Sequence, residues 1–574
     1  MEHPPQLAQA LRLLPMDSNY STWENNVGTA KSPIPLLFGG DLEASHICPG
    51  GGVASPADAL LAQLPGTSAH PSNDDGYTNI NDVGRRFMTA NGICHYKDLD
   101  HLESCTPICR GADEFTKYVQ ATRADVQDAL HRHNEASDEN QQLEVMFDNR
   151  CGRGEGAVSI GTHLNIGIPG STWQEICSGR YPAVTGFYAS AIAGIQLVAG
   201  LGCVGSANGR PHVNYQISQR SDFINTLLHI DTMGHPFRGM VNIRHEPECG
   251  PIHPLNNPIA RKHEISLDIS MSETALYVSS GLLALVAASI SAGRIAPHLI
   301  LHQPVRSLWQ WSHDPDLHSR MPLADGQEMT LPEYFASLVE FLSANAVSDT
   351  CVEDVVEAED IVSEAGALAS AFMKRDWDYT ARRVDWVQKR SLLETLLEDN
   401  PDLDWHSDAI AMVDQHYSSA DPETGLYYVQ RRLGEMETRV NEDDLAHARI
   451  APPTDTRAWG FAHMLRVLEA SPSYRILSVN WDRITVWEWG NGTPITIWLP
   501  HPESATQKEC GHLFSGAFST QEIVRAMQKI GLDRLYAMET TTSGILLELP
   551  GEIPTDTSTE YADTQTDAGL EPYP

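Results

Sequence analysis

The chain has 574 residues, of which 41% are hydrophobic and 7% aromatic. This composition excludes a wholly disordered protein, and the length predicts about two to four domains. Lysine and arginine number 39 against 76 aspartate and glutamate residues, which gives a formal net charge of −37. A field of this sign repels phosphate backbones and anionic lipids, so we expect neither nucleic acid nor a membrane surface among the partners.

Three further features predict a cytoplasmic protein. The N-terminus has no basic start and no continuous apolar segment, so it does not predict a secretory signal. The longest apolar run, residues 282–292, is too short to span a bilayer and predicts a buried helix. The ten cysteines are scattered along the chain, which is typical of free cytosolic thiols.

In chain order, residues 1–34 are polar and contain prolines, and we interpret them as an extension outside the core. Residues 34–45 predict a buried strand that ends in acidic side chains. Ser55 followed by Pro56 predicts a helix start, because serine caps the helix and proline suits its first position. The polar residues 66–82 then predict a loop.

The middle of the chain alternates helical and strand patterns. Apolar spacing predicts helices over 115–134, 272–294 and 331–345, and strands over 143–147 and 158–167. Residues 352–397 are acidic and then amphipathic. After the prolines at 452–453, a helix over 455–469 and strands over 474–479 and 485–489 predict a smaller second domain.

These patterns divide the chain into four parts. We expect an N-terminal extension over 1–34, a large domain over 35–430 and a small C-terminal domain over 431–550. The tail over 551–574 is rich in threonine and proline and carries six acidic residues without lysine or arginine, which predicts disorder.

Acidic residues in two segments could hold a metal ion. Asp41 and Glu43 lie two apart on the predicted strand, so both carboxylates can point to one side. Two hard oxygen ligands suit Mg²⁺, although a solvated strand end is the plainer interpretation. Residues 91–107 add Asp98, His101 and Glu103, and a carboxylate in such a cluster can act as a base or as a metal ligand.

A zinc site is the competing interpretation of the same segment. It would use the cysteines and histidines at positions 94, 95, 101, 105 and 109. Their spacing contains no CxxC or HxxxH pair and fits no standard zinc finger, so free thiols are the preferred interpretation. Residues 200–205 match GxGxxG, but no acidic residue follows at the distance that holds a ribose, and we interpret them as a glycine turn.

Basic and polar residues in three later segments could contact phosphates. His163 and Asn165 alternate on a predicted strand and can reach a phosphate or a metal together. Arg220 and Arg244 offer planar guanidinium groups that suit phosphates or carboxylates, although a structural ion pair is the plainer role of each. The segment 261–273 is also dense in histidine, aspartate and glutamate.

In their order along the chain, these segments resemble the Pup ligase and Pup deamidase (depupylase) family. The resemblance covers about residues 38–481 and rests on GGDLEAS, NGICHYKDLDHLESCTP, GTHLN, YQISQRSDF, VNIRHEP, RKHEISLDISMSE and VDWVQKR. That family shares the carboxylate–amine ligase fold of glutamine synthetase and glutamate–cysteine ligase. The resemblance therefore implies an α/β (α+β) fold, with a curved antiparallel sheet cradling ATP, flanking helices and a small C-terminal domain.

The resemblance also implies roles for individual residues. Asp41, Glu43 and Glu103 match metal-binding positions beside the ATP phosphates, and Asp98 matches the family's catalytic base. The positions implied around the nucleotide are His163, Arg220, Arg244, His263, Trp386 and Arg390. The chain also departs from the family pattern, with Asp41 in place of glutamate, Leu164 in place of glutamate and Cys94 in place of arginine.

The implied chemistry needs ATP and Mg²⁺. ATP would phosphorylate a glutamate side chain, and an amine would then displace the phosphate to give an amide. The leading interpretation is a ligase that joins a Pup-like small protein, or another glutamate-bearing substrate, to a protein lysine. A deamidase or depupylase that hydrolyses the same bond remains open, as does a ligase for a small molecule or peptide. A short connection between residues 41 and 91 favours the ligase, and a non-enzymatic scaffold is the weakest interpretation.

Overall fold

The computed structural model describes residues 33–69, 86–98, 101–152, 154, 156–160, 163–230, 238–244, 246–247 and 259–542. Nearly all of the predicted extension, most of the predicted loop over 66–82, and the predicted tail lie outside the described residues.

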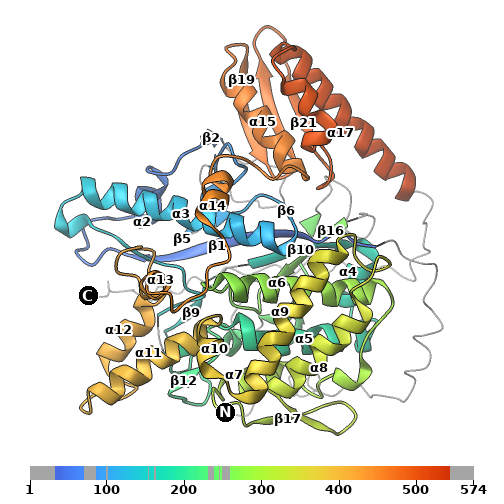
Figure 1. Ribbon diagram of the computed structural model, residues 1–574. Helices are drawn as coiled ribbons and strands as arrows, with labels where there is room; N and C mark the ends of the chain where they lie inside the picture. Colours follow the sequence, from blue (N-terminus) through green and yellow to red (C-terminus); the bar gives the residue numbers. More distant parts are fainter. Residues whose placement is uncertain are drawn as a thin grey trace, which may run out of the picture.

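One antiparallel sheet forms the centre of the fold (Figure 1). Its strand order is β15-β16-β10-β1-β5-β4-β3-β2, and β6 and β7 also pair with β1. The bounds are β1 Leu37–Ile47, β2 Thr67–Ala69, β3 Arg86–Met88, β4 Cys94–Asp98, β5 His101–Cys105, β6 Cys109–Arg110, β7 Glu144–Met146, β10 His163–Pro169, β15 Glu246–Pro247 and β16 Ile259–Glu264. The long strand β1 is central because four other strands pair with it.

Helices cover one face of this sheet and enclose the main hydrophobic core. They are α3 Ala112–Ala136, α4 Gly170–Cys177, α5 Pro182–Ala199, α6 Glu273–Ser291, α7 Pro304–Ser312, α8 Leu331–Asn345, α9 Val355–Lys374, α10 Trp377–Ala381, α11 Asp385–Asp399 and α12 Asp408–His416. The helix α13 Leu426–Arg432 packs in a separate hydrophobic cluster. The predicted helices over 115–134, 272–294 and 331–345 are confirmed as α3, α6 and α8.

The helices α5 and α6 are long and apolar enough to cross a membrane by length and composition alone. Both are almost entirely buried inside the fold, where they pack against each other. We therefore interpret them as core helices, as the sequence predicts for residues 282–292. The GxGxxG segment follows α5 rather than a strand, and Gly202 and Gly205 have positive φ values of 71° and 73°, so the predicted glycine turn is confirmed.

Local sequence signals set several helix ends. Ser55 accepts a hydrogen bond from the backbone N–H of Asp58 at the start of α2 (Pro56–Leu61), as predicted. Thr330 and Glu333 form a reciprocal capping box at the start of α8. The predicted strand over 158–167 is divided in the structure into β9 (Val158–Ser159) and β10.

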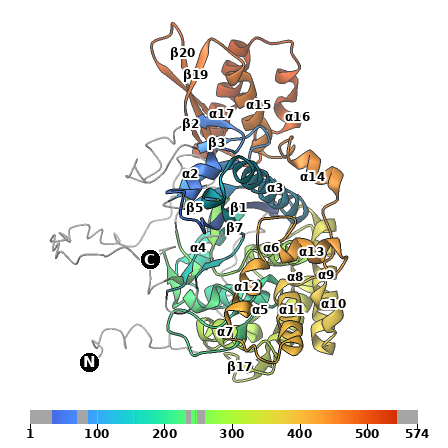
Figure 2. The same cartoon turned by 90° about the vertical axis from the view of Figure 1, so that its left-hand side faces the viewer.

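A smaller unit with its own hydrophobic cluster stands on the opposite side of the sheet (Figure 2). It contains α15 Arg457–Glu469, the antiparallel strands β19 Tyr474–Asn480, β20 Arg483–Glu488 and β21 Pro494–Trp498, and the helix α17 Thr520–Thr542. The predicted helix over 455–469 and the two predicted strands are confirmed, whereas β21 and α17 were not predicted. Met88, Cys94 and Cys105 of the large sheet join this cluster, so the two units share apolar packing.

Residues before α15 pack on the large unit. The helix α14 (Glu442–Ala448) lies against α3, and Arg449 forms ion pairs with Asp125 and Asp128 of α3. The hydroxyl of Tyr118 donates a hydrogen bond of 2.6 Å to the carbonyl of Ala451. The domain division at residue 430 stays a prediction, and the small unit's own residues in its cluster begin at Trp459.

Trp386, which the family resemblance implies at the nucleotide, belongs to the helical core. Its side chain is fully buried, and its indole N–H donates a hydrogen bond of 2.8 Å to the carbonyl of Leu197. The ring stacks on Phe372 and meets the edge of Trp377. This packing satisfies the polar atom of Trp386 and leaves no surface of the ring for a ligand.

We predict that Trp386→Ala lowers the free energy of unfolding by about 3–5 kcal/mol, because it empties a large volume in the core. The substitution should leave unchanged the ATP affinity that the family resemblance implies. Urea unfolding and nucleotide calorimetry measure the two quantities. Trp489, which is 61% exposed, gives the matched control Trp489→Ala. A Trp386→Ala variant that is as stable as the original protein but has lost ATP binding would show that Trp386 contacts the nucleotide.

Candidate active site

Strand pairing brings four acidic side chains to one face of the sheet. Glu43 of β1 lies directly opposite Glu103 of β5, and Glu103 lies opposite Tyr96 of β4. Side chains that are opposite in an antiparallel pair share a face, as do residues two apart on one strand. Asp41 and Asp98 therefore lie on the same face as Glu43 and Glu103.

Three of these carboxylates converge closely. One oxygen from each of Glu43, Asp98 and Glu103 lies within 4.8 Å of the others. Burial raises the pKa of Glu103 well above its usual range, and the charges of Glu43 and Asp41 raise it further. A divalent cation among these oxygens would remove the repulsion, so the donor set fits Mg²⁺.

Asp41 forms a second group with two histidines. Ligand atoms of Asp41, His163 and His263 also lie within 4.8 Å of one another. Burial acts to raise the pKa of Asp41, but contact with His163 and the charge of Arg261 lower it to about 2. Asp41 therefore stays ionised, while its carboxylate lies 3.8 Å from Nδ1 of His163.

Asn165 fixes the chemical state of His263. Its amide nitrogen donates a 3.2 Å hydrogen bond to Asp41, which leaves its carbonyl oxygen to accept from Nδ1 of His263 at 2.8 Å. The Nε2 atom of His263 is then unprotonated, and it is buried without a hydrogen-bond partner among the described residues. Burial and the neighbouring His163 also hold the pKa of His263 well below its usual range. A neutral imidazole with a free Nε2 is the form that ligates metals.

The predicted arginines lie within electrostatic reach of the carboxylates. Arg220 is fully buried, and its guanidinium donates to the hydroxyl of Ser159 at 3.3 Å and to the carbonyl of Ile160 at 3.0 Å. Burial and Arg238 lower the pKa of Arg220 to about 9, whereas Asp268 and Glu43 act to raise it. Burial also lowers the pKa of Arg244, whereas the negative charge of Asp41 acts to raise it.

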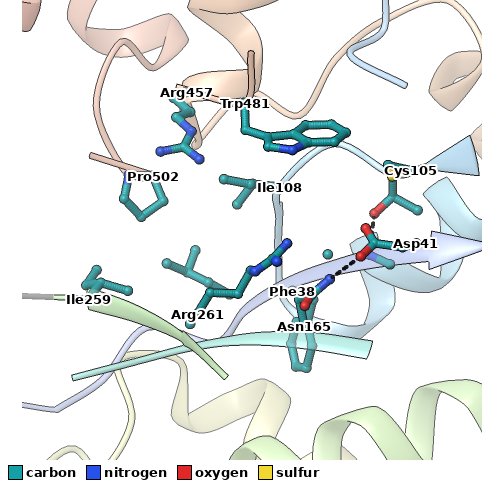
Figure 3. Close-up of a pocket in the computed structure, with 15 residues that line it drawn as sticks. Phe38, Asp41, Cys105, Ile108, Asn165, Ile259, Arg261, Arg457, Trp481 and Pro502 are labelled. Carbon is teal, nitrogen blue, oxygen red and sulfur yellow. Dashed lines mark hydrogen bonds between the residues drawn. The ribbon is translucent and has the colours of Figure 1, made fainter. Parts of the chain in front are cut away.

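A cavity lies between this face of the sheet and the small C-terminal unit (Figure 3). Its floor contains Asp41, Asn165 and Arg261, and its roof contains Arg457 and Trp481. Arg261, Arg457 and Trp481 were not predicted as site residues. Trp481 adjoins the turn between two predicted strands, and only the packing of the small unit on the sheet brings it over Asp41.

Two residues that the family resemblance implies at the nucleotide lie away from the carboxylates and the cavity. Trp386 lies in the helical core, as described above. Arg390 of α11 donates hydrogen bonds to Asp316, Glu394 and the carbonyl of Pro315, which uses its guanidinium in local contacts. We leave both residues out of the proposed nucleotide site.

The alternative zinc site is not assembled in the part of the chain that the structure describes. Among its five residues, only Cys105 belongs to a group of three possible metal ligands, and the other members of that group are Asp41 and Glu103. His95 instead contacts the hydroxyl of Ser104 at 2.8 Å, and Cys109 donates to the carbonyl of Pro107.

We predict that Glu103→Gln stabilises the metal-free protein at pH 7. Because the pKa of Glu103 is raised in the fold, ionisation above its usual pKa of 4.5 costs stability as the pH rises. Removing the charge should raise Tm by roughly 1–4 °C without metal and abolish the further rise that Mg²⁺ gives. Thermal unfolding with chelator or with Mg²⁺ measures both effects.

The exposed Glu359 supplies the control Glu359→Gln, which should change neither the metal-free Tm nor the response to Mg²⁺. A lower metal-free Tm in Glu103→Gln, or an unchanged response to Mg²⁺, would contradict this account of the carboxylates.

Comparison with known proteins gives relatives that match most of the length of this chain. The Pup deamidase/depupylase of Mycolicibacterium smegmatis is 28% identical over 454 residues, which cover 78% of this chain and 85% of the relative. The Pup–protein ligase of Paenarthrobacter aurescens is 26% identical over 385 residues, which cover 65% and 78% of the two chains.

Solved structures confirm the predicted fold. A crystal structure of the complex between the prokaryotic ubiquitin-like protein Pup and its ligase PafA matches with a TM-score of 0.67 and 19% identity, covering 90% of this chain and 99% of that chain. The Pup ligase PafA in complex with ADP matches with a TM-score of 0.62 and 22% identity, covering 77% and 89%. The family model described as "Pup-ligase protein" matches residues 55–485. This range includes the site residues Asp98, Glu103, His163, His263 and Trp481. With most of its length matched in this way, the chain belongs to the Pup-ligase protein family.

Proposed function

We propose that this protein is an ATP- and Mg²⁺-dependent ligase that joins a glutamate side-chain carboxylate to the amine of a protein lysine. The glutamate would belong to a Pup-like small protein. The observation that carries this proposal is the convergence of Glu43, Asp98 and Glu103 on one face of the sheet, beside Asp41 and two histidines. Relatives named as a Pup–protein ligase and a PafA structure with ADP agree with it. We also propose a cytoplasmic location.

The acidic residues would hold the metal and the arginines would hold the phosphates. Asp41, Glu43 and Glu103 offer oxygen ligands, and the unprotonated Nε2 of His263 offers a further ligand next to Asp41. Bound Mg²⁺ would supply positive charge to the transferring phosphoryl group. Arg220, Arg244 and Arg261 would contact phosphate oxygens, since all three lie near these carboxylates.

The reaction would proceed in two steps at this face of the sheet. The glutamate oxygen would attack the γ-phosphorus of ATP, and ADP would leave. The lysine nitrogen would then attack the acyl carbon, and phosphate would leave. Asp98 would take the proton from the nitrogen, because its half-buried carboxylate lies at the end of β4 beside Glu43 and Glu103.

Hydrolysis of the same bond is the second candidate. The Mycolicibacterium relative is a Pup deamidase/depupylase and is slightly more similar to this chain than the Paenarthrobacter ligase. Such an enzyme would use the same carboxylates with water as the acceptor. One incubation distinguishes ligation from hydrolysis. The protein is mixed with ATP, Mg²⁺, a lysine-bearing protein and a Pup-like protein ending in Gly-Gly-Glu. We expect a covalent conjugate, whereas release of Pup from a preformed conjugate without ligation would favour the hydrolase.

We predict that Asp98→Asn reduces amide formation by roughly 10²–10⁴-fold and leaves ATP affinity within a few-fold. The substitution removes the proton acceptor and keeps the size of the side chain. Single-turnover conjugation and ATP calorimetry on the same preparation separate chemistry from binding. Unchanged conjugation would rule out Asp98 as the base, and a parallel loss of ATP binding would assign it to the metal instead.

We further predict that Trp481 stacks on the adenine. It forms the roof of the cavity beside the carboxylate face, and stacking of a base on an aromatic ring is worth about 1–3 kcal/mol. Trp481→Ala should therefore raise the Kd for Mg-ATP by roughly 5- to 150-fold, whereas the exposed Trp489→Ala should leave it unchanged. Equal affinities for ATP in the two variants would place the adenine elsewhere.

A further inference from the structure

Arg110 joins the small unit to the large unit beside the cavity. It lies in β6, and its Nη1 donates a hydrogen bond of 2.5 Å to the carboxylate of Glu503 in the small unit. Its Nη2 donates to the carboxylate of Glu353, which precedes α9 in the large unit. Ile108 and Pro502, which lie close to these residues in the chain, both line the cavity. The bridge therefore stands at the edge of the proposed nucleotide site.

This bridge is held more firmly than a pair of surface charges. The side chains of Arg110 and Glu503 are only 33% and 22% exposed. The backbone N–H of Arg110 donates a 2.7 Å hydrogen bond to Glu114. The backbone N–H of Glu353 donates a 3.0 Å hydrogen bond to the carbonyl of Ile34. Because the guanidinium binds two carboxylates through separate nitrogens, its orientation is fixed, whereas a single exposed ion pair contributes little.

The bridge reaches the roof of the cavity through the loop that follows β21. Pro502, next to Glu503, accepts a 2.7 Å hydrogen bond from the backbone N–H of Arg457. The carbonyls of Leu499 and Pro500 accept hydrogen bonds of 3.4 and 3.3 Å from Nη1 of the same arginine. Both the backbone and the guanidinium of Arg457 therefore depend on the position of this loop.

A second contact from the segment before β6 holds the start of α15. The hydroxyl of Thr456 donates a 2.8 Å hydrogen bond to the carbonyl of Ile108 and also caps α15. Arg457 therefore lies between two anchor points on neighbouring residues of the large unit. One anchor is Ile108, through Thr456, and the other is Arg110, through Glu503.

We propose that Arg110 is a positioning residue that, through Glu503, holds Arg457 in the roof of the cavity. Figure 3 shows Arg457 across the cavity from Arg261. The residues that line the cavity in the described part of the chain do not include Arg110, so it would act through its partners. This inference rests on the proposed function, because the affinity that the bridge would set is that for Mg-ATP. The metal-binding carboxylates lie on β1 and β5, so Mg²⁺ binding alone should not need the bridge.

Hydrogen exchange of the full chain without nucleotide tests the bridge by itself. Arg110→Met removes both charged hydrogen bonds and keeps much of the length of the side chain. We expect exchange to be about twofold faster or more in peptides that cover residues 454–460 and 499–505, because the loop loses its anchor. Unchanged exchange in both peptides would overturn the bridge.

Another arginine–glutamate pair supplies the matched control. Arg320 of β17 (Arg320–Pro322) lies 3.0 Å from the carboxylate of Glu333 within the large unit. Arg320→Met should leave the exchange of both peptides and the affinity for Mg-ATP unchanged. If Arg110→Met does not fold, Arg110→Lys replaces it, since lysine keeps the charge but lacks the planar fork that spans two carboxylates.

Calorimetry with Mg-ATP tests the consequence for the site. Arg110→Met should raise the Kd by roughly 2- to 30-fold, the range for residues that act without touching the ligand. Glu503→Gln should also raise it, and the double variant should be no weaker than Arg110→Met, because both residues act through one contact. The rise in Tm that Mg²⁺ gives without nucleotide should be the same in all of these variants.

The two measurements separate the possible failures. Faster exchange with an unchanged Kd, or additive effects of the two substitutions, would overturn the positioning role. A lost Tm response to Mg²⁺ would overturn it as well, because the damage would then extend to the carboxylates. If the original protein binds no ATP, the proposed function fails, and hydrogen exchange alone decides whether the bridge holds the loop.

Discussion

The crowding of several carboxylates on one face of a sheet, around the buried Glu103, is the constraint on which the rest of the structure depends. The pairing of β1 with β5 puts Glu43 directly opposite Glu103, and the pairing of β1 with β10 puts Asp41 opposite His163. Like charges opposite each other destabilise a sheet. Burial, and then the charges of Glu43 and Asp41, raise the pKa of Glu103 well above its usual range, and crowded oxygen ligands of this kind fit a divalent cation.

The strand β16 shows how one segment serves both sides of the sheet. Arg261 and His263 point to the carboxylate face, in register with Gly167 and Asn165. Lys262 and Glu264 alternate with them and point to the helices, where both are fully buried and their charged groups are 3.5 Å apart. The ammonium of Lys262 also lies 5.4 Å from the ring centre of Tyr188 of α5. The contacts of Lys262 with Tyr188 and with the carbonyl of Asn242 thus anchor the strand that presents two site residues on the other face.

Much of the fold could be predicted from sequence where local signals are strong. The Ser55-Pro56 pair and the apolar spacing of 331–345 predict helices that the structure confirms. The helix α5 was missed because it is apolar on all sides, so it has no amphipathic period to mark it. The alternation of Asp41 with Glu43 correctly indicates a shared face.

The remaining site residues depend on contacts between distant segments, which spacing does not encode. Trp386 and Arg390 were inferred from family resemblance, but their surroundings in the helical layer give them structural contacts. Arg261 and Trp481 were missed for the opposite reason, because each is unremarkable in sequence and reaches the cavity only after the sheet and the small unit have packed together.

The central claim is that the carboxylates on this face of the sheet bind a metal ion that ATP binding requires. Calorimetry of ATP binding with and without Mg²⁺, on the original protein and on the Glu43→Ala, Glu103→Ala double variant, tests it most directly. The account predicts tight binding only for the original protein with Mg²⁺, because the variant lacks two of the three oxygen ligands. Equal, Mg²⁺-dependent ATP affinity in the original protein and the double variant would contradict it.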